Sequence, residues 1–258
     1  MKQERTLSIE GKEYTLLISD EPQALLEAKA SGRAVLGCLD TGNGEGASRD
    51  FQGIPYVVPS MEYVTEELLE LILRRYLGLP WLIDETERLY IREFVKEDAE
   101  NIPEEEYGKE EEIFRDPDKL EVYIKNQYGF YEYGTWAVLK KSPSLLIGMA
   151  GASNPNLPET ALQALPTLPD DLCWLELGYH IFKPYRKNGY ATEAALAIVQ
   201  WVKEQLPYTE LFACCDARNP ASARVMKRIG MHCIDANGSR TYPKTGEVAQ
   251  EWMYQMNL

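Results

Sequence analysis

The sequence is poor in the residues that build metal centres and disulfide frameworks. It holds only two histidines and five cysteines among 258 residues, and no two cysteines form a C-x-x-C pair. An odd number of cysteines without such spacing is typical of reduced thiols in a cytosolic protein. We therefore predict no metal and a cytoplasmic location. The cysteines are Cys38, Cys173, Cys214, Cys215 and Cys233.

Long apolar runs and an excess of basic side chains are also missing. No segment reaches the roughly 18 apolar residues that a membrane span needs, and residues 1–5 lead into no apolar signal-peptide core. Acidic residues outnumber basic ones by 41 to 27, which gives a net charge of −14. Because nucleic acids and anionic membranes are bound by clustered Lys and Arg, we expect neither as a partner.

What is present is a globular composition, with 45% hydrophobic and 26% charged residues, and a change of character near residue 80. A helical pattern ends at Gly78 and Pro80, which is a helix-stop signal. A strand pattern opens after residue 85. The chain is long enough for two domains. We predict a small α/β domain of unknown role over 1–80 and a larger domain over 84–258.

The 1–80 segment has a strand and helix pattern with short links, which predicts parallel pairing of its first two strands. Strands are expected at 14–18, 33–38 and 56–58, and helices at 21–31 and 64–77. The segments 19–22, 28–32 and 56–60 resemble the C-terminal half of a haloacid-dehalogenase-type Rossmann-like domain. Nothing upstream of Tyr14 supplies that family's nucleophilic aspartate motif, so the resemblance implies a unit without catalytic residues.

The 84–258 segment alternates strand and helix patterns around a Pro-rich stretch at 154–171, which we interpret as a long loop. The acidic residues of 104–112 are interpreted as a solvated surface. Strands are expected at 88–92, 135–139, 145–150, 172–182, 211–215 and 251–256, and helices from 96 and at 116–128, 190–206 and 220–229.

A basic turn links the 172–182 strand to the helix that begins at Tyr190. The first N–H groups of a helix have no internal partner and lie at its positive dipole end, so such a turn can bind a diphosphate. Gly189 permits close approach of a ligand, and Arg186 and Lys187 add positive charge to an acidic chain. A purely structural turn is the other interpretation.

A second motif follows the 211–215 strand, where Asn219 stands at the expected N-cap of a helix and Pro220 suits the first helical position. With the basic turn, this motif resembles the GCN5-related N-acetyltransferases (GNATs), and most of all the branch that acetylates alanine on ribosomal proteins. The GNAT pattern [Q/R]-x-x-G-x-[G/A] is met by Arg186, Gly189 and Ala191. The resemblance covers 84–258. Asn219 as a helix cap alone remains the simpler interpretation of that residue.

The resemblance implies a mixed, strongly twisted α/β sheet in which two central parallel strands splay apart and acetyl-CoA enters the resulting V. The expected strand contacts to the cofactor are His180 and Ile181. The expected contacts at the turn are Arg186, Lys187, Asn188, Gly189, Tyr190 and Ala191. Asn219 and Ser222 are expected beside the pantetheine or the thiol.

The resemblance also implies direct attack of a primary amine on the thioester in a ternary complex. Glu176 is the candidate general base, since the alanine-acetyltransferase branch carries Glu there; a structural glutamate is the alternative. Many GNATs carry a tyrosine acid seven residues after the Asn. That position is Met226 here, and a thioether cannot donate a proton. Ser222 or a water molecule remains as a donor, or the reaction uses none.

The expected acceptor is a peptide N-terminus, a lysine, a polyamine, an aminoglycoside or a small metabolite. Aromatic residues of 126–133 and the 154–171 loop either line the acceptor side, pack in the core or form contacts in a homodimer. Three other functions stay open. They are a CoA-binding regulator that has lost catalysis, an interaction scaffold that uses 1–80, and a phosphate or dinucleotide enzyme built on 1–80. The last would need a phosphate fingerprint that the glycine loop at 42–46 lacks.

Overall fold

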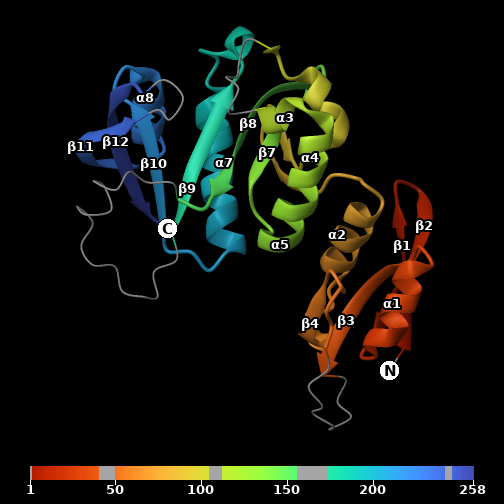
Figure 1. Ribbon diagram of the computed structural model, residues 1–258. Coiled ribbons are helices and arrows are strands. Elements are labelled where there is room, and N and C mark those ends of the chain that lie inside the picture. Colours follow the sequence, from red (N-terminus) through yellow and green to blue (C-terminus); the bar gives the residue numbers. More distant parts are fainter. Residues whose placement is uncertain (1, 41–49, 105–111, 156–173, 242–245) are drawn as a thin grey trace. The chain divides into compact units, whose positions relative to one another are not determined.

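The computed structural model describes residues 2–40, 50–104, 112–155, 174–241 and 246–258 (Figure 1). The chain divides into two compact units, Met1–Trp81 and Leu82–Leu258. This division falls between residues 80 and 84, where the helix-stop signal gives way to a strand pattern. Each unit has its own sheet and its own hydrophobic core.

Unit 1 is a four-stranded sheet, in the order β1-β2-β3-β4, with one helix on each face. Helix α1 packs Leu25 and Ala28 against Leu17 and Val35. Helix α2 packs on the other face, against the alternate strand residues such as Leu16 and Leu36. The bounds are β1 (Lys2–Ile9), β2 (Lys12–Ser19), α1 (Pro22–Ala30), β3 (Ala34–Asp40), β4 (Val57–Ser60) and α2 (Glu66–Tyr76).

The parallel pairing of β2 with β3 agrees with the sequence prediction, but β1 was not predicted. Strand β1 pairs antiparallel with β2 at the sheet edge, and most of its side chains are polar and exposed. Its sequence therefore lacks the apolar alternation that marks a strand. The hairpin closes at Glu10 and Gly11, whose φ angles of 49° and 78° suit a tight two-residue turn.

Unit 2 is an eight-stranded sheet in the order β11-β12-β10-β9-β8-β7-β6-β5. Every neighbouring pair is antiparallel except β9 and β10. The mixed α/β fold predicted for this segment is confirmed. The strands are β5 (Leu82–Glu85), β6 (Leu89–Arg92), β7 (Thr135–Lys140), β8 (Leu145–Ser153), β9 (Trp174–Ile181), β10 (Glu210–Asp216), β11 (His232–Thr241) and β12 (Val248–Asn257).

The helices of unit 2 cover both faces of this sheet. Helix α7 packs on one face and forms the main core with the strands and α8, while the turn η2 and helix α4 pack on the opposite face of β6–β8. The helical elements are η2 (Lys96–Asn101), α3 (Glu112–Arg115), α4 (Pro117–Tyr123), the π-helical turn η5 (Ile124–Tyr128), α5 (Gly129–Tyr131), η6 (Lys183–Tyr185), α7 (Tyr190–Gln205) and α8 (Pro220–Arg228).

Several sequence predictions for unit 2 need correction. The helix expected from residue 96 is only a 3₁₀ turn, and the 116–128 helix changes to a π-helical turn at Ile124. Strands β5 and β11 were not predicted, because β5 is short and β11 is mostly exposed and interrupted by register shifts. Most of the acidic stretch and of the Pro-rich loop lies in 105–111 and 156–173, outside the described residues.

Helix α7 lies close to the sheet because its buried face is rich in alanine. Ala194, Ala195 and Ala197 are buried together with Ile198 and other apolar residues of the helix. Small side chains allow the helix backbone to approach the strands, and the larger residues fill the space further along. The ring of Trp201 meets Trp136 of β7 edge-on, at 4.7 Å between centroids. This packing fixes where the helix begins, and therefore where the basic turn lies.

The pairing of β8 with β9 depends on a glycine. A Cβ on Gly148 would lie 2.3 Å from the His180 carbonyl oxygen and 2.9 Å from the Ile181 Cα. We predict that Gly148→Ala lowers the free energy of unfolding by about 2 kcal/mol, because the strands must move apart. Urea unfolding followed by circular dichroism measures this change. The matched control is Gly178→Ala on β9, where a Cβ meets nothing within 4 Å; equal losses in both variants would contradict the prediction.

Candidate cofactor and acceptor site

The central parallel strands of unit 2 pair over only three residues. Their ladder joins Trp174 to Glu210 and ends where Glu176 pairs with Phe212. Beyond this point β9 continues beside β8 as far as Ile181, while β10 continues beside β12 as far as Asp216. Each strand keeps its outer neighbour, so the two diverge and form a V that opens toward their C-terminal ends. Glu176 lies at its apex.

The turn between β9 and α7 stands at the open end of this V. Gly189 is the N-cap of α7 in the left-handed conformation, with φ 84°, and no side chain caps the helix. Lys187 also has a positive φ, 65°. The Asn188 side chain braces the turn by donating to the carbonyls of Tyr185 and Arg186, both at 3.1 Å. Uncapped amides at a helix start and in a left-handed turn favour an anion.

The Arg186 side chain folds back onto the end of β9. Its Nε donates to the Ile181 carbonyl at 2.7 Å, and its Nη2 lies 3.3 Å from the His180 Nε2. Arg186 therefore ties the turn to the strand, which the sequence pattern does not reveal. The Ile181 carbonyl, expected to meet the pantetheine, already accepts this hydrogen bond. Lys187, Asn188 and Gly189 are exposed, and Tyr190 and Ala191 are partly buried.

Helix α8 begins on the other arm of the V. The Asn219 Oδ1 accepts a hydrogen bond from the Ser222 amide at 3.2 Å, so Asn219 caps the helix, as the simpler interpretation predicted. The Ser222 Oγ lies 2.8 Å from the hydroxyl of Tyr179, which also lies 3.0 Å from the Ser222 carbonyl oxygen. Tyr179 extends from β9 and joins the two arms. Burial raises the pKa of Tyr179 to about 12.

Tyr179 is a candidate functional residue that the sequence analysis missed. The family motif directed attention to position 226, whose Met side chain is 1% exposed and lies in the core. Residue 179 belongs to β9, and strand alternation places it on the face that α7 and α8 cover. Its proximity to Ser222 depends on how α8 packs, which no local pattern reports.

Glu176 lies on the opposite face of the sheet, with Phe212 and Trp174. The rings of Phe212 and Trp174 meet edge-on, 5.0 Å apart, and the carboxylate of Glu176 is half-buried. Further along this face, the Glu251 Oε1 lies 2.8 Å from the Arg240 Nε. Burial raises the pKa of Glu251. The positive charge of Arg240 partly lowers this pKa, and the negative charge of Glu176 raises it further. Arg240 pairs with Glu251 on this face.

The adjacent cysteines of β10 point to opposite faces, as strand alternation predicts. Cys215 belongs to the main core, and Cys214 packs with Phe212 and Met253. Burial raises the pKa of the Cys214 thiol to about 12, with a further contribution from Glu176, and burial raises that of Cys215 to about 11. Both thiols are therefore protonated at neutral pH and poor nucleophiles.

The aromatic residues of 126–133 differ in burial. Tyr128 and Tyr133 are buried, and their hydroxyls bond to the Thr135 carbonyl and to the Asn154 Oδ1. These two residues pack in the core. Phe130 is 78% exposed, so it does not pack in the core. The Pro-rich loop expected on the acceptor side lies, from residue 156 to 173, outside the described residues.

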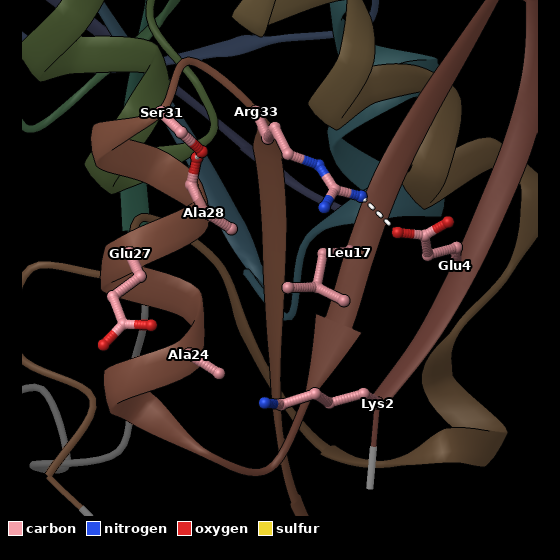
Figure 2. A pocket seen from close by; sticks show the side chains of 8 residues that line it. All are labelled: Lys2, Glu4, Leu17, Ala24, Glu27, Ala28, Ser31 and Arg33. Atoms are coloured by element: carbon pink, nitrogen blue, oxygen red, sulfur yellow. Dashed lines mark hydrogen bonds and ion pairs between the residues drawn. The ribbon is translucent and has the colours of Figure 1, made fainter.

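Unit 1 holds a shallow pocket of about 520 Å³ beside α1 (Figure 2). Its charged residues are engaged with one another or with neighbours. Arg33 pairs with Glu4 at 2.5 Å, and Lys2 with Glu21 at 3.3 Å. The Gly-rich loop at 42–46 lies outside the described residues. Across the described ranges, no His, Cys, Asp or Glu residues gather in threes as metal ligands, and no helix is long and apolar enough to span a bilayer.

An uncapped glycine turn at the open end of splayed strands is suited to a long ligand that carries a diphosphate, as in acyl-CoA-dependent transferases. Comparison with known families agrees. The model of the acetyltransferase (GNAT) domain matches residues 88–232, which is more than half of the chain. The chain therefore belongs to the GNAT acetyltransferase family, as the resemblance of its two motifs predicts.

Individual relatives agree with this assignment. The uncharacterized N-acetyltransferase YjdG of Bacillus subtilis is 24% identical over 110 residues, 43% of this chain and 57% of that protein. The uncharacterized N-acetyltransferase YnaD of the same organism is 36% identical over 80 residues, 31% of this chain and 46% of that protein. The chain thus spans about half the length of these relatives.

A solved structure shows the same fold. The ribosomal-protein-S5-alanine acetyltransferase of Vibrio fischeri superposes with a TM-score of 0.51 at 14% identity, covering 69% of this chain and 96% of that one. At this identity the likeness concerns the fold alone.

The turn offers a direct test of the cofactor site. We predict that Gly189→Ala weakens CoA binding about tenfold, since a side chain at φ 84° costs roughly 1–2 kcal/mol and displaces the amides. Isothermal titration with CoA measures it. The control is Gly230→Ala. Gly230 follows the C-terminal end of α8 and also has a positive φ, 96°, so this variant carries the same kind of backbone strain away from the turn. Equal CoA affinity in both variants would argue against a ligand at this turn.

Proposed function

We propose that the protein is an acetyl-CoA-dependent N-acetyltransferase that moves the acetyl group directly to a primary amine. The observation that carries the proposal is the conjunction of two features in unit 2. They are the V between β9 and β10 and the uncapped Gly189 turn at its open end. The diphosphate would be held by the turn, and the thioester end would approach the apex, where Glu176 stands.

Glu176 is proposed as the general base. In direct transfer, the amine nitrogen forms a bond to the acetyl carbon, the carbon–sulfur bond breaks, and the ammonium proton must leave. A half-buried carboxylate at the apex is placed to accept this proton, directly or through water. Its position beside the last paired residue, Phe212, supports this role. On the same face the Glu251 carboxylate is buried and paired with Arg240, so Glu176 is the proposed acid that would attract the ammonium.

The leaving thiolate needs a hydrogen-bond donor, and Met226 cannot supply one. We propose that the Tyr179 and Ser222 hydroxyls, 2.8 Å apart at the start of α8, take this role. The pKa of Tyr179, about 12, keeps its hydroxyl protonated at every pH at which the enzyme would be assayed. In this proposal the tyrosine hydroxyl comes from β9 instead of α8, and Ser222 of α8 lies beside it.

The acceptor classes given above stay as the candidates: a peptide N-terminus, a lysine, a polyamine, an aminoglycoside or a small metabolite. A homodimer and a cytoplasmic location likewise stay predictions from the sequence. A catalytically inactive CoA-binding regulator is the second candidate, favoured by the buried Met226. Thiol release from acetyl-CoA over an amine panel, with mass spectrometry of the products, separates the two. CoA binding without transfer to any amine would support the regulator.

For the base, we predict that Glu176→Gln lowers kcat at least about 100-fold, because general base catalysis contributes that much or more, while the Kd for acetyl-CoA stays within about twofold. Steady-state kinetics and calorimetry measure the two effects. Glu210→Gln, at the other end of the same β9–β10 ladder, is the control. An unchanged kcat across pH would remove Glu176 from the mechanism.

For the thiolate donor, we predict that Tyr179→Phe lowers kcat about tenfold or more, by the same factor from pH 6 to pH 10. The reason is that the hydroxyl loses its proton only near its pKa of about 12. Tyr208→Phe removes a hydroxyl that bonds to Tyr133 at the other end of β10 and serves as the control. A loss that appears only at one end of the pH range would contradict this role.

A further inference from the structure

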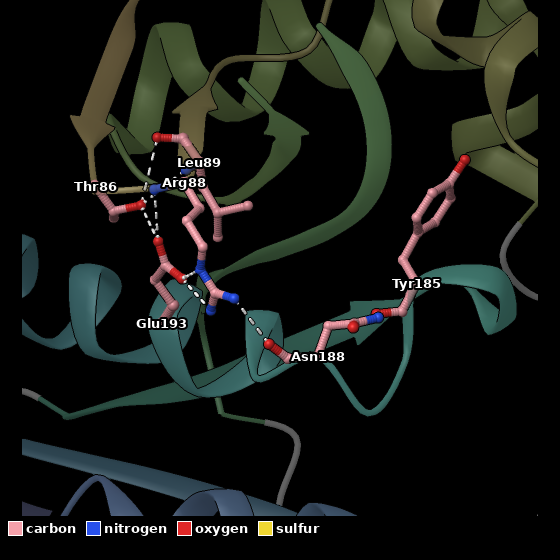
Figure 3. Close-up of polar contacts among 6 residues, drawn as sticks. All are labelled: Thr86, Arg88, Leu89, Tyr185, Asn188 and Glu193. Atoms are coloured by element: carbon pink, nitrogen blue, oxygen red, sulfur yellow. Dashed lines mark hydrogen bonds and ion pairs between the residues drawn. The ribbon is translucent and has the colours of Figure 1, made fainter. Parts of the chain in front are cut away.

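The carboxylate of Glu193, in the first turn of α7, is held by the turn between β5 and β6. Its Oε1 accepts hydrogen bonds from the Thr86 hydroxyl at 2.6 Å and from the Arg88 amide at 2.9 Å. Its Oε2 accepts from the Arg88 Nε at 2.7 Å and lies 2.6 Å from the Arg88 Nη2 (Figure 3). Burial acts to raise the pKa of Glu193, and these hydrogen bonds outweigh it, so the pKa lies below its usual value.

The same guanidinium also reaches the glycine turn. The Arg88 Nη1 donates to the Asn188 carbonyl at 3.0 Å, and the guanidinium carbon lies 4.7 Å from the centre of the Tyr190 ring. A Cβ on Gly189 would lie 3.4 Å from the Arg88 Nη2. Arg88 therefore contacts Asn188 and Tyr190, the residues on either side of Gly189, although it lies about a hundred residues earlier in the sequence.

The contact with the Asn188 carbonyl has a directional consequence. A peptide unit is planar and trans, so its N–H points away from its C=O. The peptide between Asn188 and Gly189 is held by its carbonyl on the Arg88 side. The Gly189 N–H is therefore directed to the opposite side, away from Arg88. Without this hydrogen bond, the peptide would be free to rotate, because glycine permits many backbone conformations.

The ion pair has an electrostatic consequence. Glu193 lies in the first turn of α7, where a free carboxylate would be attracted to the unpaired amides and would repel a diphosphate. Arg88 and Thr86 bind both carboxylate oxygens and keep them on the β5–β6 side. The positive charge of Arg88 offsets the negative charge of Glu193 beside the turn.

We propose that Arg88 is a positioning residue for the anion-binding turn. It directs the Gly189 amide and prevents Glu193 from opposing a bound diphosphate. The inference rests on the proposed function, because that function makes the diphosphate of CoA the ligand. Arg88 acts here through the turn and through Glu193, not by contact with the reacting atoms.

The test measures CoA binding by calorimetry on the full chain. Arg88→Met is expected to raise the Kd for CoA about tenfold or more. The reason is that the Gly189 amide is no longer directed toward the diphosphate, and the negative charge of Glu193 is no longer neutralised. The double variant Arg88→Met/Glu193→Gln should recover part of the affinity, because it removes the exposed carboxylate. If Arg88 had a purely structural role, the double variant would bind CoA no more tightly than Arg88→Met.

A matched control lies on the same edge of the sheet. The Lys141 Nζ is 2.7 Å from the Glu85 Oε1 and 5.1 Å from the centre of the Tyr90 ring. This arrangement has the same kind of ion pair and cation–π contact as Arg88, without a contact to the turn. Lys141→Met is expected to leave the Kd for CoA within about twofold. A loss equal to that of Arg88→Met would overturn the inference.

Dephospho-CoA, which lacks the 3′-phosphate, distinguishes positioning from direct contact. Positioning of the diphosphate turn predicts the same fold loss for CoA and dephospho-CoA in Arg88→Met. A loss confined to CoA would mean that Arg88 touches the 3′-phosphate, and it would overturn the positioning role. If Arg88→Met does not fold, Arg88→Lys replaces it, since it keeps the charge and loses the paired donors. Its affinity should lie between those of the wild type and Arg88→Met.

The inference and the proposed function fail in different ways. Wild-type protein that binds CoA, together with an Arg88→Met variant of equal affinity, would overturn the inference alone. Folded wild-type protein that binds neither CoA nor acetyl-CoA would overturn the proposed function, and the inference with it.

Discussion

The short parallel ladder between β9 and β10 is the constraint on which the candidate site depends. The two strands pair over three residues and then follow different partners, because β8 holds one and β12 holds the other. Beyond the ladder the facing edges of the two strands no longer pair with each other, and the proposed cofactor site uses this divergence. The apex places Glu176 where the divergence begins, and the open ends place the two helix starts.

The N-termini of α7 and α8 are capped differently. Helix α8 carries its own cap, because the Asn219 side chain accepts from the Ser222 amide. Helix α7 begins with Gly189 and has no side-chain cap. A helix that leaves its first amides uncapped at a solvent-exposed turn is suited to an external anion. Three hydrogen bonds nevertheless hold the turn. Asn188 braces it from within, Arg186 ties it to Ile181 of β9, and Arg88 before β6 donates to the Asn188 carbonyl.

The two faces of the unit 2 sheet carry different chemistry. On the helix side, the Tyr179 and Ser222 hydroxyls lie among apolar core residues and stay protonated. On the other side, Glu176 and Glu251 bring negative charge to the face where Phe212 and Met253 are buried. In the proposed reaction the amine loses a proton while the thiolate receives a hydrogen bond. Unit 1 supplies none of these groups and has its own sheet and core.

The family resemblance, the central strands, the helices that begin at Tyr190 and Pro220, and the cap at Asn219 could all be predicted from local sequence patterns. The reason is that a glycine or Asn-Pro at a helix start acts within a few residues. The sequence did not reveal the polar edge strands β1 and β11, whose pairing comes from their neighbours and not from apolar alternation. Three contacts follow from the folded arrangement alone: Arg186 folds back onto β9, Tyr179 meets Ser222, and Arg88 binds Glu193. These contacts join residues distant in the chain or depend on side-chain direction, and packing alone brings them together.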